Sequence, residues 1–167
     1  MKKVIIFDMD GVLFDTIPFA RKVFIERHPG VTEKMYNEIH SGNFHVEAEK
    51  YSHLKIKETE EEKNKYSVEY TEQKSKAVLF TGIKNLLEDL HSKGCILVLN
   101  TNAYAKNTLP LLENSGIREL FDFIATAEIS KDKIEKFKII ETFFRREKHP
   151  SLLGIFDTVE DLRTFLL

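Results

Sequence analysis

The sequence of 167 residues has little cysteine, no long apolar run and almost no net charge, and each shortage excludes a class of protein. A single cysteine, Cys95, cannot close a disulfide within the chain, which excludes a disulfide-built scaffold. No apolar run approaches the roughly 20 residues of a membrane-spanning helix, and the N-terminal apolar stretch is too short for a signal peptide. The 25 basic and 27 acidic side chains leave a net charge of −2, without the basic excess of general nucleic-acid binders. We therefore expect a soluble, cytoplasmic protein with no membrane and no nucleic-acid partner.

Four short apolar runs are rich in β-branched or aromatic residues, and polar or turn residues follow each of them. Continuous apolar runs of this length are typical of strands that are buried on both faces of a parallel sheet. Helical patterns lie between the runs. This alternation predicts an α/β fold with a Rossmann-like parallel sheet. The expected strands span residues 4–7, 95–99, 121–125 and 152–156, and the expected helices span 82–90, 106–114 and 133–146.

A long stretch after the first run, residues 16–78, contains no strand-like segment. It has the character of four helices, over about 18–27, 31–40, 44–56 and 58–76. Such an insertion is far longer than the usual connection between a strand and a helix. We expect a small all-α lobe at one end of the sheet, with a helical extension packed on a sheet face as the alternative.

Two carboxylates, Asp8 and Asp10, follow the first expected strand directly. Ligands of open α/β sheets bind beyond the carboxyl ends of the strands. Because side chains alternate along a strand, the two carboxylates share a face wherever the chain stays extended. Carboxylates this close repel each other, so a cation is their natural partner, and oxygen ligands without nearby His or Cys favour Mg²⁺.

Polar side chains also follow the other strands. Asp157 comes directly after the last strand, where a parallel sheet would bring it beside Asp8, and Asp161 lies one helical turn onward. Thr101 and Asn102 follow the second strand, and a hydroxyl and an amide near a helix start can hold phosphate oxygens. The strand ends together predict a site for a phosphate group and a metal ion.

Three of these segments make the sequence similar to the haloacid dehalogenase (HAD) superfamily of phosphohydrolases, in the subgroup with a helical cap after the first motif. The segments are VIIFDMDGVLFD, ILVLNTN and LGIFDTVED, in family order between residues 4 and 161. The subgroup includes phosphoglycolate phosphatases and β-phosphoglucomutase-like proteins. The resemblance implies a HAD-like core over residues 1–15 and 79–167, with residues 16–78 as an all-α cap.

The resemblance also implies a role for each matching residue. Asp8 would attack phosphorus as the nucleophile, and Asp10 would act as the general acid and base. Thr101 and Asn102 would bind the phosphate group. The Mg²⁺ would be held by the Asp8 side chain, the Asp10 main-chain carbonyl and Asp157, with Asp161 nearby or acting through water.

The third motif of the family, a lysine that often precedes a proline, is less clear because no proline follows a lysine here. Lys131 is our first choice for this phosphate-binding lysine, and Lys133 is the second. Lys136 and Lys138 lie deeper in the expected helix, and we expect both at the surface.

These roles imply a Mg²⁺-dependent phosphatase that hydrolyses a small phosphorylated metabolite through an aspartyl-phosphate intermediate. A phosphomutase of the same superfamily uses the same residues and is one alternative. The other alternative is a catalytically weak binding or regulatory protein on the HAD scaffold.

The chain stops at Leu167, soon after Asp161, whereas the family usually continues through a helix to at least one more strand. We therefore expect the fourth strand to be an exposed edge. A homodimer could form through this edge, because an unpaired strand offers its backbone groups to another chain.

Overall fold

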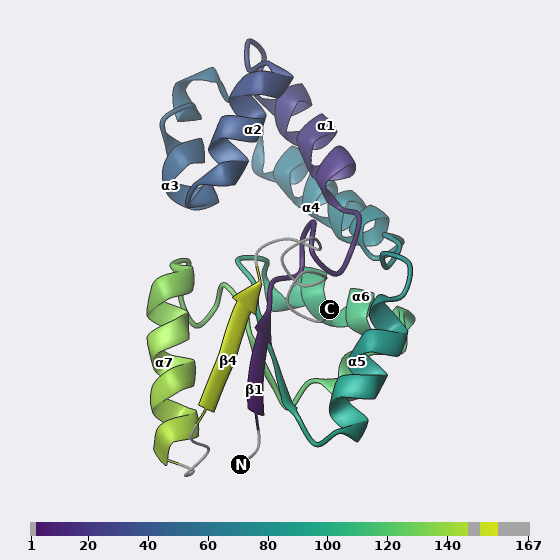
Figure 1. Ribbon diagram of the computed structural model, residues 1–167. Helices are drawn as coiled ribbons and strands as arrows, with labels where there is room; N and C mark the ends of the chain where they lie inside the picture. Colours follow the sequence, from purple (N-terminus) through teal and green to yellow (C-terminus); the bar gives the residue numbers. More distant parts are fainter. Residues whose placement is uncertain (1–2, 147–150, 157–167) are drawn as a thin grey trace. The chain divides into compact units, whose positions relative to one another are not determined.

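The computed structural model describes residues 3–146 and 151–156 (Figure 1). The chain divides into two compact units, one made of residues 1–15 and 75–167 and the other of residues 16–74. We call them the core unit and the cap unit and describe each by itself. Across the described residues, no helix combines the length and the apolar character that crossing a membrane demands.

The core unit is built on a four-stranded sheet in the order β3-β2-β1-β4, with every pair of neighbours parallel. This confirms the predicted α/β fold. Phe7 at the end of β1 pairs with Leu99 of β2 and with Phe156 of β4, so three strands end side by side. The strands are β1 (Lys3–Phe7), β2 (Ile96–Asn100), β3 (Phe123–Ala125) and β4 (Ser151–Phe156).

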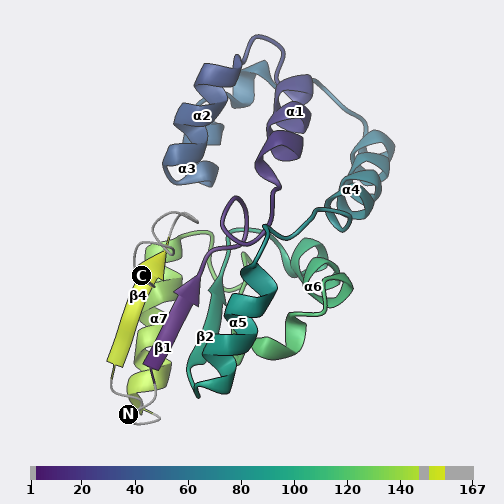
Figure 2. The ribbon, with the colours of Figure 1, turned by 45° about the vertical axis from the view of Figure 1, so that its right-hand side comes forward.

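Both faces of the sheet are covered by helices, which explains why the middle of each strand is apolar on both faces (Figure 1 and Figure 2). Alternate residues of β1 and β2 pack on opposite faces. Ile5 and Phe7 join the cluster that includes α5 (Ile83–Ser92) and α6 (Ala105–Asn114). Val4, Ile6, Ile96 and Val98 join the cluster that includes Ile140 and Phe144 of α7 (Lys133–Arg146).

β4 lies at one end of the strand order and pairs with β1. The residues that follow it, 157–167, lie outside the described part of the chain. The expected pairing of two chains through this strand therefore stays a prediction.

The cap unit consists of α1 (Ile17–Arg27), α2 (Glu33–Ser41), α3 (Phe44–Glu49) and α4 (Glu60–Lys74). Buried side chains of this unit form a small core of their own, with Phe24 and Phe44 packed around Tyr36. The predicted helix over 44–56 is too long. After Glu49 the chain tightens into hydrogen bonds between residues three apart and continues as a 3₁₀ turn over Ser52–Leu54, which packs Leu54 against the cap core.

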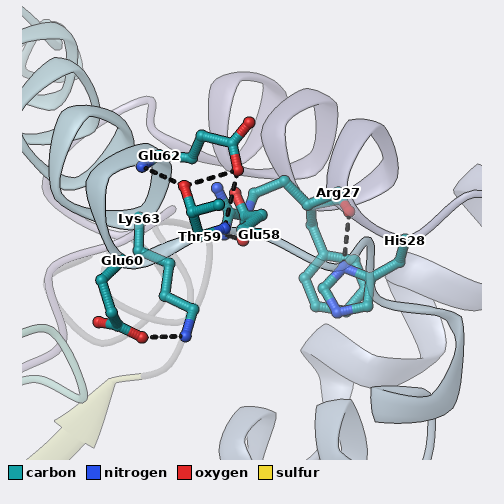
Figure 3. A network of polar contacts seen from close by, with 8 residues as sticks. Arg27, His28, Glu58, Thr59, Glu60, Glu62 and Lys63 are labelled. Atoms are coloured by element: carbon teal, nitrogen blue, oxygen red, sulfur yellow. Dashed lines mark hydrogen bonds and ion pairs between the residues drawn. The ribbon is translucent and has the colours of Figure 1, made fainter.

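Polar contacts tie the end of α1 to the segment that leads into α4 (Figure 3). Arg27 forms an ion pair with Glu58, with side-chain exposures of 12% and 8%, and its backbone carbonyl accepts a hydrogen bond from Ile56 N. The guanidinium also lies 3.5 Å from the ring centre of Tyr66, within the range of a cation–π contact. Burial raises the pKa of Tyr66 to about 12, so its phenol stays neutral at ordinary pH.

Candidate active site

The loop after β1 places Asp8 and Asp10 at the end of the central strand. Met9 is fully buried, and its carbonyl accepts hydrogen bonds from Leu13 N at 3.0 Å and Phe14 N at 3.1 Å. Gly11 takes a positive φ of 76°, a conformation that glycine adopts without strain. The chain therefore turns back immediately after Asp10, and both carboxylates stay at the strand end.

Asp8 is held by a lysine from the first turn of α7. The Lys133 Nζ donates to Asp8 Oδ2 at 2.5 Å, a contact between residues 125 positions apart in the sequence. The Asp8 side chain is only 15% exposed. Burial raises the pKa of Asp8; the Lys133 ammonium acts in the opposite direction, whereas the charge of Asp10 adds to the rise. The site thus pairs a buried carboxylate with a cation and keeps a second carboxylate close by.

The structure brings Lys133, rather than Lys131, onto Asp8. Lys131 is exposed in the loop before α7, whereas Lys133 is the first residue of the helix. Asp132 caps this helix, because its Oδ1 accepts a hydrogen bond from Ile134 N at 2.8 Å. Lys133, our second choice from the sequence, is the lysine that fits this geometry, and its binding to phosphate stays a prediction.

The loop after β2 brings Thr101 and Asn102 to the same end of the sheet. Thr101 is fully buried, and its Oγ1 accepts a hydrogen bond from Ala103 N at 3.1 Å. Its own N–H donates to Ala125 O at 2.9 Å, which extends the pairing of β2 with β3. The Thr101 hydroxyl thus helps to shape the loop, and phosphate binding by Thr101 and Asn102 stays a prediction.

Lys136 is not a surface cation, and that expectation is wrong. The side chain is fully buried, whereas Lys138 is exposed as expected. The sequence did contain a sign of this burial. Lys136 lies four and eight residues before Ile140 and Phe144, which both pack on the sheet, so all three share one helical face.

Asn100, the last residue of β2, is a second residue that the sequence did not single out. Its side chain is almost fully buried, and its Nδ2 donates to the Lys133 backbone carbonyl at 3.1 Å. Among the residues that the structure describes, the Asn100 Oδ1 has no hydrogen-bond partner. A buried acceptor without a partner costs free energy, and this one lies where β2 ends beside Asp8.

The predicted metal ligands are only partly within the described residues. Asp157 and Asp161 lie outside them, and no cluster of three or more potential metal ligands occurs among residues 3–146 and 151–156. Asp8 offers a carboxylate oxygen and Asp10 a main-chain carbonyl oxygen at one strand end. Mg²⁺ commonly binds through one or two carboxylates and completes its shell with water and substrate oxygens, so this donor set fits Mg²⁺.

The fold and the site together define an α/β protein with carboxylates, a lysine and a hydroxyl–amide loop at its strand ends and a helical unit inserted after β1. A sequence model of the haloacid dehalogenase-like hydrolase family matches residues 5–160. The chain therefore belongs to the haloacid dehalogenase-like hydrolase family. Among curated proteins, no match was found.

Solved structures resemble the chain over most of its length. The CbbY protein of Rhodobacter sphaeroides, solved with phosphate, has a TM-score of 0.66 at 22% identity, covering 90% of this chain and 74% of that one. A predicted phosphoglycolate phosphatase from Haemophilus somnus has a TM-score of 0.63 at 23% identity, covering 85% and 72%. A protein assigned as a β-phosphoglucomutase from Thermotoga maritima has a TM-score of 0.53 at 27% identity, covering 79% and 64%. The neighbours thus include phosphatase and phosphomutase relatives.

Proposed function

We propose that the protein is a Mg²⁺-dependent phosphatase that hydrolyses a small phosphorylated metabolite through an aspartyl-phosphate on Asp8. The observation that carries the proposal is the buried Asp8 at the end of β1, which is paired with Lys133 and has Asp10 close by. The predicted phosphatase from Haemophilus somnus and the phosphate-bound protein from Rhodobacter sphaeroides support the same class of chemistry.

In the first step, an Asp8 carboxylate oxygen attacks phosphorus, and the bond between phosphorus and the substrate oxygen breaks. Asp10 gives its proton to that leaving oxygen. In the second step, water attacks phosphorus, Asp10 takes the water's proton, and the bond between phosphorus and Asp8 breaks to release inorganic phosphate. Dividing the displacement in this way replaces one difficult step by two easier ones.

Lys133 would stabilise the negative charge of the transferring phosphoryl group. Its ammonium donates to Asp8 and would face the phosphoryl oxygens. Thr101 and Asn102 would bind the same group from the loop after β2. The Asp8 side chain, the Asp10 main-chain carbonyl and Asp157 would hold the Mg²⁺, with Asp161 nearby or acting through water. When bound, the ion would neutralise phosphoryl oxygens and reduce their repulsion from Asp8.

Hydrolysis of p-nitrophenyl phosphate by the full chain, with Mg²⁺ and with the ion removed by a chelator, tests the proposal. We expect turnover only with Mg²⁺. Replacing the nucleophile in Asp8→Asn should reduce kcat on the order of 10⁴-fold or more. Asp89→Asn, at an exposed position of α5, is the matched control and should keep the wild-type rate. No Mg²⁺-dependent turnover by the folded protein would overturn the phosphatase proposal and favour a binding or regulatory role.

A phosphomutase is the second candidate, and the Thermotoga maritima neighbour at 27% identity favours it. A phosphomutase returns the phosphoryl group to another sugar hydroxyl instead of to water. Phosphorus NMR of a reaction with a sugar phosphate separates the two activities. Accumulation of inorganic phosphate supports the phosphatase, and accumulation of an isomeric sugar phosphate supports the mutase.

A further inference from the structure

Lys136, on the second turn of α7, places a fully buried ammonium among three oxygen acceptors. Its Nζ donates to Asn102 Oδ1 at 2.6 Å, to Thr101 O at 2.8 Å and to Ser130 O at 2.9 Å. A protonated lysine has three N–H donors, so every donor of this side chain has a partner. Buried charges persist only where such partners are provided.

The three acceptors come from two different loops. Thr101 and Asn102 belong to the loop after β2, and Ser130 belongs to the loop before α7. A second contact joins the same parts of the fold, because Asn100 Nδ2 donates to the Lys133 carbonyl at 3.1 Å. Contacts at the Lys133 carbonyl and at the Lys136 ammonium therefore fix the start of α7 to the end of β2 and the loop after it.

The register of the sheet relates these contacts to the proposed nucleophile. Phe7 pairs with Leu99, so Asp8, the residue directly after β1, follows next to Asn100, the last residue of β2. The Lys133 ammonium reaches Asp8 from the helix start that Asn100 and Lys136 secure. A shift of that helix start would move Lys133 relative to Asp8. It would also move Lys133 relative to the loop that carries Thr101.

An apolar side chain would fill the place of Lys136 at lower cost if the position served packing alone. Burying an ammonium is unfavourable, and removing its partners would leave a charge without compensation. Burial lowers the pKa of Lys136 to about 8, with the nearby charge of Lys133 acting in the same direction and Asp8 and Asp132 opposing it. The fold therefore keeps a costly group where it joins the two loops.

We propose that Lys136 is a positioning residue for the reaction proposed above. Its ammonium binds the Thr101–Asn102 loop to the loop before α7 and so holds Lys133 on Asp8 in the arrangement that phosphoryl transfer requires. Lys136 acts through Lys133 and the loop after β2 and does not itself contact the phosphoryl group. The inference rests on the proposed phosphatase function.

The test compares Lys136→Met, which keeps the length and loses the charge, with Lys138→Met, the same change at an exposed position of α7. Misplacement of catalytic groups by about 1 Å can cost about 10²-fold in rate. We expect kcat for p-nitrophenyl phosphate to fall about 10²-fold in Lys136→Met with KM nearly unchanged. The rate of Lys138→Met should stay at the wild-type value. A wild-type kcat in folded Lys136→Met would overturn the proposal.

A double variant separates positioning from general weakening of the fold. If Lys136 acts through Lys133, adding Lys136→Met to Lys133→Met should cost much less than it costs in the wild-type protein, because coupled residues are not additive. Equal losses in both backgrounds would overturn the proposal. Should Lys136→Met fail to fold, Lys136→Gln retains two amide donors, and the same comparison is made with that variant.

Hydrogen exchange followed by mass spectrometry tests the contact between Lys136 and the loop after β2 without an activity measurement. The Thr101 amide donates to Ala125 O, and the Ala103 amide donates to Thr101 Oγ1. We expect peptides over residues 101–105 to exchange faster in Lys136→Met than in Lys138→Met, with the α5 peptides unchanged. Unchanged protection of this loop would overturn the proposal that Lys136 holds the loop after β2 in place. If the wild-type protein shows no turnover but Lys136→Met still shows this loss of protection, the phosphatase proposal alone would be refuted.

Discussion

The core unit and the cap unit use polar side chains in different ways. In the core, the contacts at the strand ends join residues that are far apart in the sequence, such as Asp8 with Lys133 and Thr101 with Lys136. In the cap, many contacts join residues three or four positions apart at helix ends, such as Thr59 with Glu62 and His28 with Phe24 (Figure 3). The core contacts assemble a site, whereas the local cap contacts define where helices begin and end.

Two glutamates make the difference concrete. Glu62 accepts a hydrogen bond from Thr59 N within its own helix start. Glu128 accepts from Ala105 N at the start of α6, 23 residues away. Hydrogen bonding lowers the pKa of both carboxylates, from Thr59 in Glu62 and, in Glu128, first from Thr126 and then from Ala105 N. A glutamate that accepts from a backbone N–H thus caps its own helix in the cap unit, whereas in the core unit it joins two distant segments. We therefore expect substitutions in the core to reduce activity most and substitutions in the cap to reduce stability.

Among the variants that test this comparison of the two units, Lys133→Met in the core should have the largest effect. The change removes the ammonium from buried Asp8 and removes a cation that would stabilise the transferring phosphoryl group. Loss of one such group typically costs about 10² to 10³-fold in kcat. We expect that loss in p-nitrophenyl phosphate hydrolysis, with the far-UV circular dichroism spectrum unchanged.

Lys131→Met is the matched control, because Lys131 is exposed two residues earlier. We expect this variant to keep more than half of the wild-type rate. A larger loss in Lys131→Met than in Lys133→Met would restore our first choice of lysine and contradict the geometry of the site.

The fold could be predicted from the sequence because its patterns are local. The strands are continuous apolar runs, and α7 follows a helical period from Lys133 to Arg146, as predicted. The predicted end of a helix was wrong where the local sequence pattern competes with tertiary packing. The helix predicted over 44–56 ends at Glu49, because the following turn brings Leu54 against the cap core.

The candidate site could be predicted only where a motif lies on one segment. Asp8 and Asp10 follow a strand directly, so their place at the sheet end follows from the α/β pattern. Lys133, Lys136 and Asn100 depend on how α7 lies against β2. A lysine in a charged helix is usually exposed. The spacing of Lys136 from Ile140 and Phe144 is a sign of its burial, but only the three-dimensional contacts show which oxygens accept from its ammonium.

The next largest effect should come from Arg27→Met in the cap. Arg27 and Glu58 form the most buried ion pair described in this unit, and Arg27 also contacts the Tyr66 ring. Removing one partner of a buried pair leaves the other charge without compensation and typically costs about 3 kcal/mol. We expect urea denaturation to show that loss, and hydrogen exchange to localise it to peptides of residues 16–74.

Two further variants check the origin of that loss. Lys22→Met removes an exposed cation from the same helix, and its pair with Glu26 is surface-exposed, so we expect a change within about 0.5 kcal/mol. Adding Glu58→Gln to Arg27→Met removes the uncompensated carboxylate and should restore part of the stability. A double variant less stable than Arg27→Met would show that the buried charge is not the cause.

The smallest effect should come from Thr59→Ala at the start of α4. Thr59 Oγ1 accepts a hydrogen bond from Glu62 N at 3.2 Å, and Glu62 Oε2 accepts from Thr59 N at 2.7 Å, which together form a capping box. Loss of a capping hydroxyl typically costs about 1 kcal/mol. We expect this loss near neutral pH in urea denaturation, with the phosphatase rate unchanged.

Acid pH should weaken the same cap by a second route. The hydrogen bonds from Thr59 lower the pKa of Glu62 below its ordinary value of 4.5, so the carboxylate stabilises the folded state above that value. This stabilisation is lost as the pH falls through the lowered pKa, because protonation removes the charge that accepts both bonds. Glu62→Gln should therefore be less stable than wild type near neutral pH and approach it at acid pH. A stability difference that grows on acidification would contradict the capping box.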